Sequence, residues 1–169
     1  MKTITMPRLF TLLFCLSAMV YGQESNSLAE NLERKNNIDI TLGGTGLFTS
    51  INYNRIVMVK SNYFINAAVG IGVFPLVSAI TFPHQITYNL GSKNSFIELG
   101  VGGTYMNSQS TIEGVNKTFS SYHLSPIVGW RKHFKKPFLF RVYANPLTNI
   151  LGKHDSTIAY LGISLGYRF

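Results

Sequence analysis

A histidine and a serine two residues apart are the side chains in this chain best suited to nucleophilic catalysis. They occur as His123-Leu124-Ser125, and an extended backbone would place both side chains on one face. A histidine base beside a serine nucleophile is the pattern of acyl transfer and ester hydrolysis. An acidic residue to orient the histidine is not evident nearby, because Glu113 and Asp155 fall in expected loops. Such a pair recurs by chance in many strands, so we expect no catalytic site and keep His123 and Ser125 as candidates for an alternative.

Charged residues near one end of the expected strands form a second group. Glu98, Arg131 and Arg141 fall at similar levels of three consecutive strands, on the face that the alternation described below turns inward. Buried charges require mutual pairing and hydrogen bonds. We therefore expect a structural ion-pair cluster rather than a proton or ion path. The five expected interior charges are Asp39, Glu98, Arg131, Arg141 and Arg168.

Composition restricts the class of protein. The chain has 169 residues, of which 46% are hydrophobic, 13% aromatic and 13% charged. A disordered chain would be rich in charge and poor in aromatics. The single cysteine, Cys15, excludes a disulfide scaffold and a multi-cysteine metal site. The remaining histidines, His84, His133 and His154, are scattered, so we expect no metal and no cofactor.

The first 22 residues have the pattern of a secretory signal peptide. Lys2 and Arg8 give a basic start, and an apolar run follows from Leu9 to Val20. Small residues then precede an expected cleavage after Gly22. A buried helix is the alternative interpretation. Residues 23–36 are polar and charged, and we expect a short periplasmic tail there.

Strict alternation of apolar and small or polar residues dominates the rest of the chain. It is clearest at the C-terminus, where every odd position from Ala159 to Phe169 is apolar or aromatic. A period of two indicates β-strands with two different faces. The expected strands are residues 37–44, 47–58, 63–73, 83–90, 95–106, 121–133, 138–146 and 157–169.

The connections between these strands sort into two groups. Those at 60–62, 91–94 and 135–137 are short and polar, with turn chemistry. Those at 74–83, 107–120 and 147–156 are longer, and the first connection, around 43–46, is short and Gly-rich. With an even strand number, the tight turns all fall on the side of the termini. This is the arrangement of an outer-membrane barrel, whose periplasmic turns are short and whose outer loops are longer.

The apolar face of each strand is too large and too free of charge for a water-exposed exterior. Small polar residues and a few charges would fill the inside of an eight-stranded barrel, and the apolar face would then contact lipid. Tyr105 and the residues near Phe74 would form the outer aromatic belt. The periplasmic belt would contain Tyr53, Trp130, Phe138, Tyr167 and Phe169.

The final residues carry a family resemblance. Gly162-Ile163-Ser164-Leu165-Gly166-Tyr167-Arg168-Phe169 resembles the terminal strand of Gram-negative outer-membrane barrels, and residues 37–169 resemble the small eight-stranded barrels of the OmpA/OmpX type. The resemblance implies an antiparallel up-and-down transmembrane barrel. It also implies that Tyr167 and Phe169 belong to the signal read by the barrel-assembly machinery.

We accordingly expect an integral outer-membrane protein, cleaved near Gly22, with a structural or surface-interaction role. Its expected partners are outer-membrane lipid, lipopolysaccharide and the assembly machinery, and we expect a monomer. Lysines gather at turns, which suits anionic headgroups rather than nucleic acid. Two known small outer-membrane barrels, a deacylase and a palmitoyltransferase, modify lipid A with His and Ser. The first alternative is therefore a lipid A-modifying enzyme with His123 as base and Ser125 as nucleophile.

A second alternative is a secreted soluble barrel that binds a ligand in an apolar lumen. A transmembrane barrel leaves no unpaired edge in lipid. We expect the first strand to neighbour the last. Asp39 and Arg168 would then lie near each other at the periplasmic end, in direct contact or one step of stagger apart.

Overall fold

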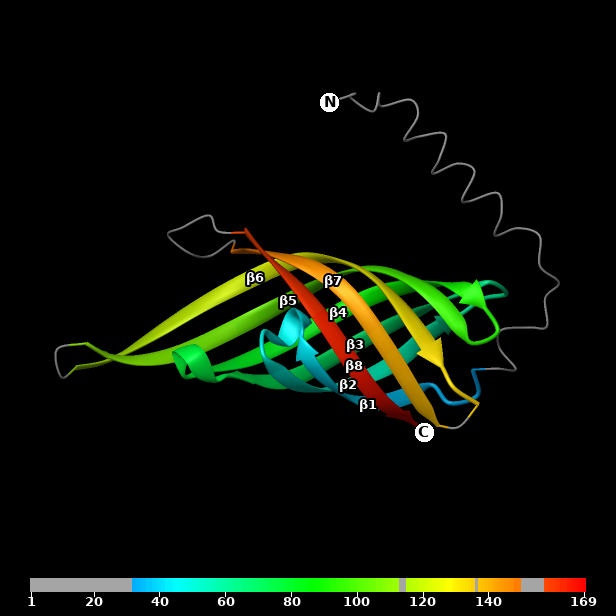
Figure 1. Cartoon of the computed structure of the whole chain (residues 1–169), viewed down its shortest axis with the longest axis horizontal. Coiled ribbons are helices and arrows are strands. Elements are labelled where there is room, and N and C mark those ends of the chain that lie inside the picture. Colours follow the sequence, from blue (N-terminus) through cyan, green and yellow to red (C-terminus); the bar gives the residue numbers. More distant parts are fainter. Residues whose placement is uncertain (1–31, 113–114, 136, 150–156) are drawn as a thin grey trace, which may run out of the picture.

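The computed structural model describes residues 32–112, 115–135, 137–149 and 157–169, and it is a single closed antiparallel barrel (Figure 1). Every strand pairs with its neighbours in sequence, and β1 pairs with β8. The fold class expected from the alternation is confirmed. The elements are β1 (Asn36–Gly43), η1 (Gly44–Gly46), β2 (Thr49–Val59), β3 (Tyr63–Phe74), η2 (Pro75–Val77), β4 (Ala79–Ser92), β5 (Ser95–Ile112), β6 (Val115–His133), β7 (Phe138–Asn149) and β8 (Thr157–Arg168).

Closure depends on the register between the first and last strands. Asn37 lies opposite Arg168, Asp39 opposite Gly166 and Thr41 opposite Ser164. Because β1 and β8 are fully paired along this stretch, neither is an open edge. Within the described residues, no helix is long and apolar enough to cross a bilayer.

Alternate side chains along each strand point into the barrel and out of it. In β1, Asp39 and Thr41 are buried, while the neighbouring Ile40 and Leu42 are exposed. The same pattern continues around the barrel, so the buried side is mostly polar and the exposed side mostly apolar. A soluble protein has the opposite arrangement.

Two of the expected loops are largely strand. Residues 107–120 were expected as a connection, but β5 continues to Ile112 and β6 begins at Val115. This hairpin extends past the rest of the barrel (Figure 1). Similarly, β4 begins at Ala79 rather than at residue 83. Residues 107–112 and 115–120 are rich in Ser, Thr and Asn, and cross-strand backbone pairing rather than an apolar face keeps them extended. The start of β4 instead continues the alternation, with Ile80 and Phe82 exposed and Thr81 buried.

Two further parts of the sequence interpretation concern residues that the structure describes little or not at all. The expected signal peptide, residues 1–22, and the connection at 150–156 lie outside the described residues. Of the expected periplasmic tail, residues 32–36 are described; Asn36 is already the first residue of β1, and the side chain of Leu32 is 1% exposed. It packs with Ile56, Phe64 and Phe96 in an apolar cluster at the end of the barrel where the short turns lie. Ile56 faces inward by the same alternation as Asn52 and Asn54, and the register shift that follows, between Ile56 and Met58, lets Val59 pack against this cluster.

Candidate functional site

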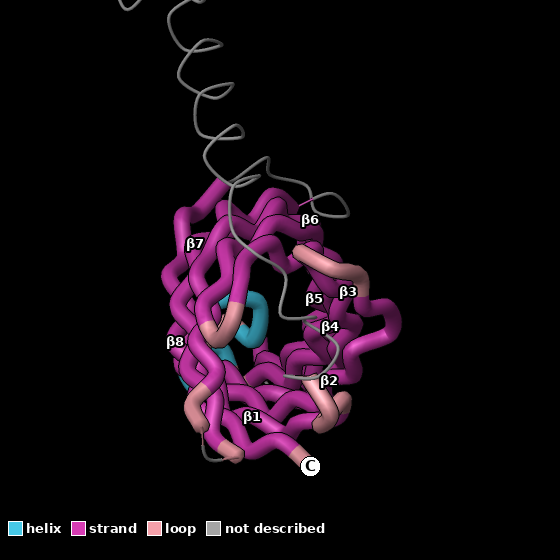
Figure 2. Tube along the Cα trace, turned by 90° about the vertical axis from the view of Figure 1, so that its right-hand side faces the viewer, coloured by secondary structure: helices cyan, strands magenta, loops and turns pink. Residues whose placement is uncertain are grey.

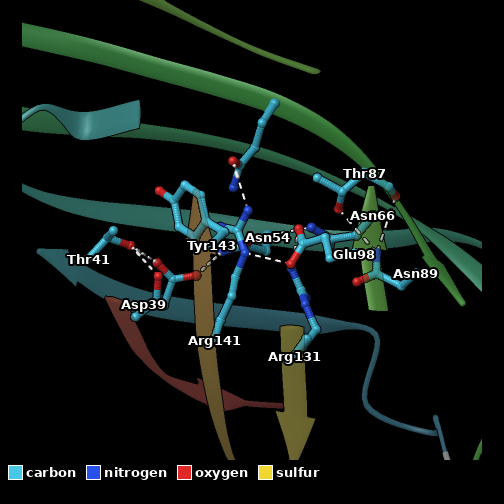
Figure 3. Close-up of polar contacts among 12 residues, drawn as sticks. Asp39, Thr41, Asn54, Asn66, Thr87, Asn89, Glu98, Arg131, Arg141 and Tyr143 are labelled. Atoms are coloured by element: carbon cyan, nitrogen blue, oxygen red, sulfur yellow. Dashed lines mark hydrogen bonds and ion pairs between the residues drawn. The ribbon is translucent and has the colours of Figure 1, made fainter. Parts of the chain in front are cut away.

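The lumen contains a network of paired charges near the end of the barrel where the short turns lie. Glu98 of β5 accepts a hydrogen bond from Nε of Arg141 of β7 at 2.7 Å. Arg131 of β6 approaches the other carboxylate oxygen through Nη2 at 3.4 Å. All three side chains are at most 1% exposed, and they point toward one another inside the barrel (Figure 3). The carboxylate therefore joins three consecutive strands.

Asp39 is the centre of a second set of hydrogen bonds in the lumen. Its Oδ1 accepts hydrogen bonds from Thr41 Oγ1 and Asn52 Nδ2, each at 2.9 Å. Its Oδ2 accepts one from Asn54 Nδ2 at 2.6 Å. Asn66 Nδ2 donates in turn to Asn54 Oδ1 at 3.3 Å (Figure 3). Neutral donors rather than an arginine thus surround the Asp39 carboxylate in these contacts.

Arg141 connects the charges to the next level of the lumen. Its Nη2 donates to Gln85 Oε1 at 3.1 Å, and its Cζ lies 3.8 Å from the centroid of the Tyr143 ring. A guanidinium over an aromatic face is a favourable cation–π arrangement. We call Asp39, Glu98, Arg131 and Arg141 the charged layer.

Above the charged layer, the connection between β1 and β2 folds into the barrel. Gly44, Thr45 and Gly46 form η1, and all three are buried. Figure 2 shows this turn inside the ring of strands. The backbone N–H of Thr45 donates to the Tyr143 hydroxyl at 3.2 Å, and Thr81 Oγ1 donates to the Gly46 carbonyl at 3.1 Å. This inner turn therefore fills part of the lumen that the sequence analysis assigned to small polar residues and charges from the strands.

Glycines leave the space that Tyr143 occupies. A Cβ on Gly44 would lie 2.0 Å from the Tyr143 hydroxyl, and one on Gly162 would lie 2.4 Å from Cζ of the ring. Gly44 also has a φ of 61°, which L side chains rarely adopt. The Gly-rich run was visible in the sequence, but nothing in it indicated that the turn would fold inward.

The remaining expected interior charge, Arg168, lies at the end near the termini. Its Nη2 donates to the Phe134 carbonyl at 2.8 Å, and its Nη1 lies 3.3 Å from His133 Nδ1. The register places Arg168 opposite Asn37, one inward position from Asp39. The structure thus places all five expected charges inside the barrel and brings Glu98, Arg131 and Arg141 together.

The two candidate catalytic residues are not joined as a base and a nucleophile. Nε2 of His123 lies 3.1 Å from Ser121 Oγ. Ser125 is 0% exposed, and its hydroxyl has no hydrogen-bond partner among the described residues. Glu113 and Asp155 lie outside the part of the chain that the structure describes. Among the described residues, no three His, Cys, Asp or Glu side chains gather as metal ligands.

The two residues of the expected assembly signal lie at the end of β8. Tyr167 and Phe169 are both exposed on the outer surface. Tyr167 contacts Phe138 edge to face, with ring centroids 5.9 Å apart. They are thus placed beside the other aromatic residues expected in the periplasmic belt.

Comparison with solved structures identifies the architecture. The N-terminal β-barrel domain of Pseudomonas aeruginosa OprF aligns with a TM-score of 0.58 and 9% identity, over 80% of this chain and 96% of that domain. The chain has the eight-stranded barrel fold of small outer-membrane proteins. A second structure, that of Ail, the attachment invasion locus protein of Yersinia pestis, aligns with a TM-score of 0.44 and 11% identity, over 80% of this chain and 94% of that one. No protein-family profile matches the sequence, and no curated protein sequence matches it.

Proposed function

We propose that the protein is an integral β-barrel of the Gram-negative outer membrane with a structural or surface-interaction role and no catalytic activity. The observation that carries this proposal is the inverted distribution of side chains. Large apolar residues are exposed on every strand, while the buried side chains are mostly polar or charged. Burying one large apolar side chain is worth about 1.5–3 kcal/mol, so a whole surface of them favours lipid over water.

Aromatic residues at both ends of the apolar surface support the same location. The five aromatic residues expected in the periplasmic belt are all exposed, and two of them, Phe138 and Tyr167, are in contact. The five are Tyr53, Trp130, Phe138, Tyr167 and Phe169. Toward the other end, Phe82 and Tyr105 are exposed with ring centroids 6.3 Å apart. Aromatic belts of this kind mark the two membrane–water interfaces of transmembrane barrels.

The contents of the lumen support a structural rather than a porin-like role. In the charged layer, Glu98 joins side chains from β5, β6 and β7, and Asp39 of β1 is hydrogen-bonded to Asn52 and Asn54 of β2. The inner turn fills the level above this layer. An eight-stranded barrel has an interior that side chains can fill. The secreted soluble barrel, by contrast, requires an apolar lumen for its ligand.

The surroundings of Ser125 support a non-catalytic role. A serine nucleophile needs a base within hydrogen-bond reach. The hydrogen bond recorded for the side chain of His123 is to Ser121 instead.

Fractionation of Gram-negative cells that express the protein tests the location. The proposal expects it in the outer membrane, with an electrophoretic mobility that changes when the sample is heated. An epitope at Glu113 should be accessible on intact cells, and the matched epitope at Lys93 should not. Recovery in the soluble periplasmic fraction would refute the membrane location.

Mass spectra of lipid A from cells with and without the gene test the absence of catalysis. Identical acylation patterns are expected. The enzyme alternative would be established if the gene caused lipid A to gain or lose an acyl chain and the Ser125→Ala variant no longer caused that change.

A further inference from the structure

The exposed cations of the chain gather at one end of the barrel. Among the side chains that the structure describes, every exposed or half-buried Lys and Arg lies at the end where the short turns and the C-terminus are (Figure 1). The other described cations, Arg131, Arg141 and Arg168, point into the lumen. We call the outer group the basic collar, and it consists of Arg34, Lys35, Arg55, Lys60, Lys93, Lys132 and Lys135. The side chains of Lys117, Lys136 and Lys153 lie outside the described set.

The basic collar is distributed around the circumference of the barrel. Its members come from the segment before β1, from the ends of β2 and β6, and from the turns β2–β3, β4–β5 and β6–β7. Strands that are neighbours in sequence are also neighbours in this closed barrel, so these positions do not gather on one side of it. A partner that contacts all of them must therefore surround the barrel.

Little negative charge accompanies the basic collar. Three acidic side chains are described, and two of them, Asp39 and Glu98, are buried in the lumen. The third, Glu33, is exposed. Both ion pairs among the described residues are formed by Glu98 with arginines of the lumen. The seven cations of the collar thus have no ion-pair partner in the described part of the chain, and their combined field attracts anions.

Two of the cations define the depth of the collar in the membrane. Arg55 follows Tyr53 on the outer face of β2, and Lys132 follows Trp130 on the outer face of β6. A step of two residues moves about 7 Å along a strand. On the proposed membrane location, on which this inference rests, the two charges lie just beyond the aromatic belt and therefore at the level of the lipid headgroups. Long basic side chains reach this level while their stems cover the apolar wall.

The direction of the same two side chains favours a lipid over a soluble partner. Arg55 shares the outer face of β2 with Ile51, and Lys132 shares that of β6 with Val128, so both project sideways from the wall. A soluble acidic polymer would approach the turns from the end of the barrel, whereas headgroups beside the wall contact the turns and the outer face together. Clusters of about four to eight Lys and Arg beside a membrane are typical of sites for anionic lipids.

We propose that the basic collar binds the phosphates of anionic phospholipids of the phosphatidylglycerol class in the periplasmic leaflet. Phosphatidylglycerol has a net negative charge, whereas the headgroup of phosphatidylcholine also carries a cationic ammonium that the collar repels. The collar therefore selects lipids by net charge and not by acyl chain. The short turns, which are periplasmic in barrels of this kind, assign the leaflet.

Trp130 reports on the lipid next to Lys132, because both residues lie on the outer face of β6. The full-length mature protein is folded in phosphatidylcholine vesicles that contain a minor fraction of lipid brominated near the headgroup end. The brominated lipid is either phosphatidylglycerol or phosphatidylcholine with the same acyl chains. Both leaflets have one composition, so the orientation of the protein in the vesicle does not affect the result.

We expect brominated phosphatidylglycerol to quench Trp130 with an apparent affinity at least about fivefold higher than that of brominated phosphatidylcholine. Fivefold corresponds to about 1 kcal/mol, the contribution of one Lys or Arg beside an anionic surface. The preference should disappear in about 1 M salt, where the Debye length is about 3 Å.

Two variants of Lys132 and a matched control test whether the collar causes the preference. Lys132→Gln should lower the preference at Trp130 about fivefold, and Lys132→Glu should lower it further. Arg55→Gln removes one positive charge from β2, which is four strands from β6 in either direction around the barrel. Four strands span about 19 Å of wall, about twice the Debye length in 0.1 M salt, so the control should keep the preference. The heat-dependent mobility of each variant shows whether it is folded.

The outcomes separate this proposal from the membrane location. Equal quenching by the two lipids overturns the lipid collar alone, and a collar that serves a soluble acidic partner gives that result. A preference that Lys132→Gln leaves unchanged overturns the assignment to these residues. An epitope at Lys93 that is accessible on intact cells overturns the periplasmic leaflet. A folded protein whose Trp130 is quenched by neither lipid overturns the membrane location and the collar together.

Discussion

Nε of Arg141 lies 2.7 Å from Oε2 of Glu98, so side chains from β7 and β5 meet across the lumen in front of β6. Arg131 contributes the second guanidinium from β6. The Glu98 carboxylate is therefore the ion-pair partner of two buried arginines. Its removal would leave both guanidinium groups buried without a negative partner.

Glu98→Gln should therefore destabilise the barrel strongly. Removing one partner of a buried ion pair costs about 3–5 kcal/mol, because the remaining charge stays buried. The free energy of unfolding in urea, measured with the protein in lipid vesicles, checks this. Ser164→Ala, which removes a neutral hydrogen bond in the same lumen, serves as the control and should cost about 1 kcal/mol. Equal effects of the two variants would show that the charges are not paired as described.

Gly162→Ala should be destabilising because the new methyl group would enter the space of Tyr143. Overpacking of this kind costs about 1–3 kcal/mol. The cost should shrink when Tyr143→Leu is already present, and a double-mutant cycle of unfolding free energies measures that coupling. Strict additivity of the two substitutions would contradict the contact.

Thr41 and Ser164 provide a geometric check of barrel closure. Their hydroxyl oxygens lie 2.8 Å apart across the β1–β8 seam. Thr41→Cys with Ser164→Cys should form a disulfide under mild oxidation, seen as a shift on a non-reducing gel. Thr41→Cys with Thr87→Cys, which joins β1 to β4, should not. The opposite pattern of cross-links would exclude a closed meander of this order.

The sequence was sufficient for the parts of the structure that depend on alternation. Counting positions in steps of two puts Glu98, Arg131 and Arg141 on one face, and the structure places them inside. Alternation persists wherever one face contacts a different solvent from the other. Strand order and closure then follow from an even number of strands with no edge left unpaired.

Features that depend on backbone pairing or on long-range packing were not predictable in this way. Residues 107–120 have the polar composition of a loop, yet residues 107–112 and 115–120 pair as strands. The position of the inner turn depends on the space around Tyr143. The burial of Leu32 depends on an apolar cluster to which three strands contribute. The register places Pro126 of β6 opposite Pro146 of β7, where pairing between the two strands is interrupted, and the sequence without that register does not show this.

Phe169→Ala should lower the amount of folded protein in the outer membrane. The family resemblance implies that the assembly machinery reads the terminal aromatic residue. Phe169 is exposed at the end of β8 and its backbone N–H donates to the Asn36 carbonyl, a bond that the substitution retains. The heat-modifiable fraction on a gel measures assembly, and refolding of the purified variant into vesicles measures intrinsic stability. We expect the heat-modifiable fraction in cells to fall while refolding into vesicles stays at the wild-type level. A wild-type heat-modifiable fraction in cells would show that Phe169 is not part of the assembly signal.

The central claim is that the apolar exterior contacts lipid, and the single tryptophan of the chain tests it without any substitution. Trp130 points outward, is 42% exposed and donates from Nε1 to Ser95 Oγ at 2.8 Å. In phosphatidylcholine vesicles its fluorescence should be quenched by lipids brominated along their acyl chains. Bromines near the headgroup end should quench more than bromines near the bilayer centre, because Trp130 lies in the expected interfacial belt. Lipid contact of the exterior would be contradicted if brominated lipid at either depth left the fluorescence unchanged. The electrophoretic mobility of the same sample shows whether the protein is folded.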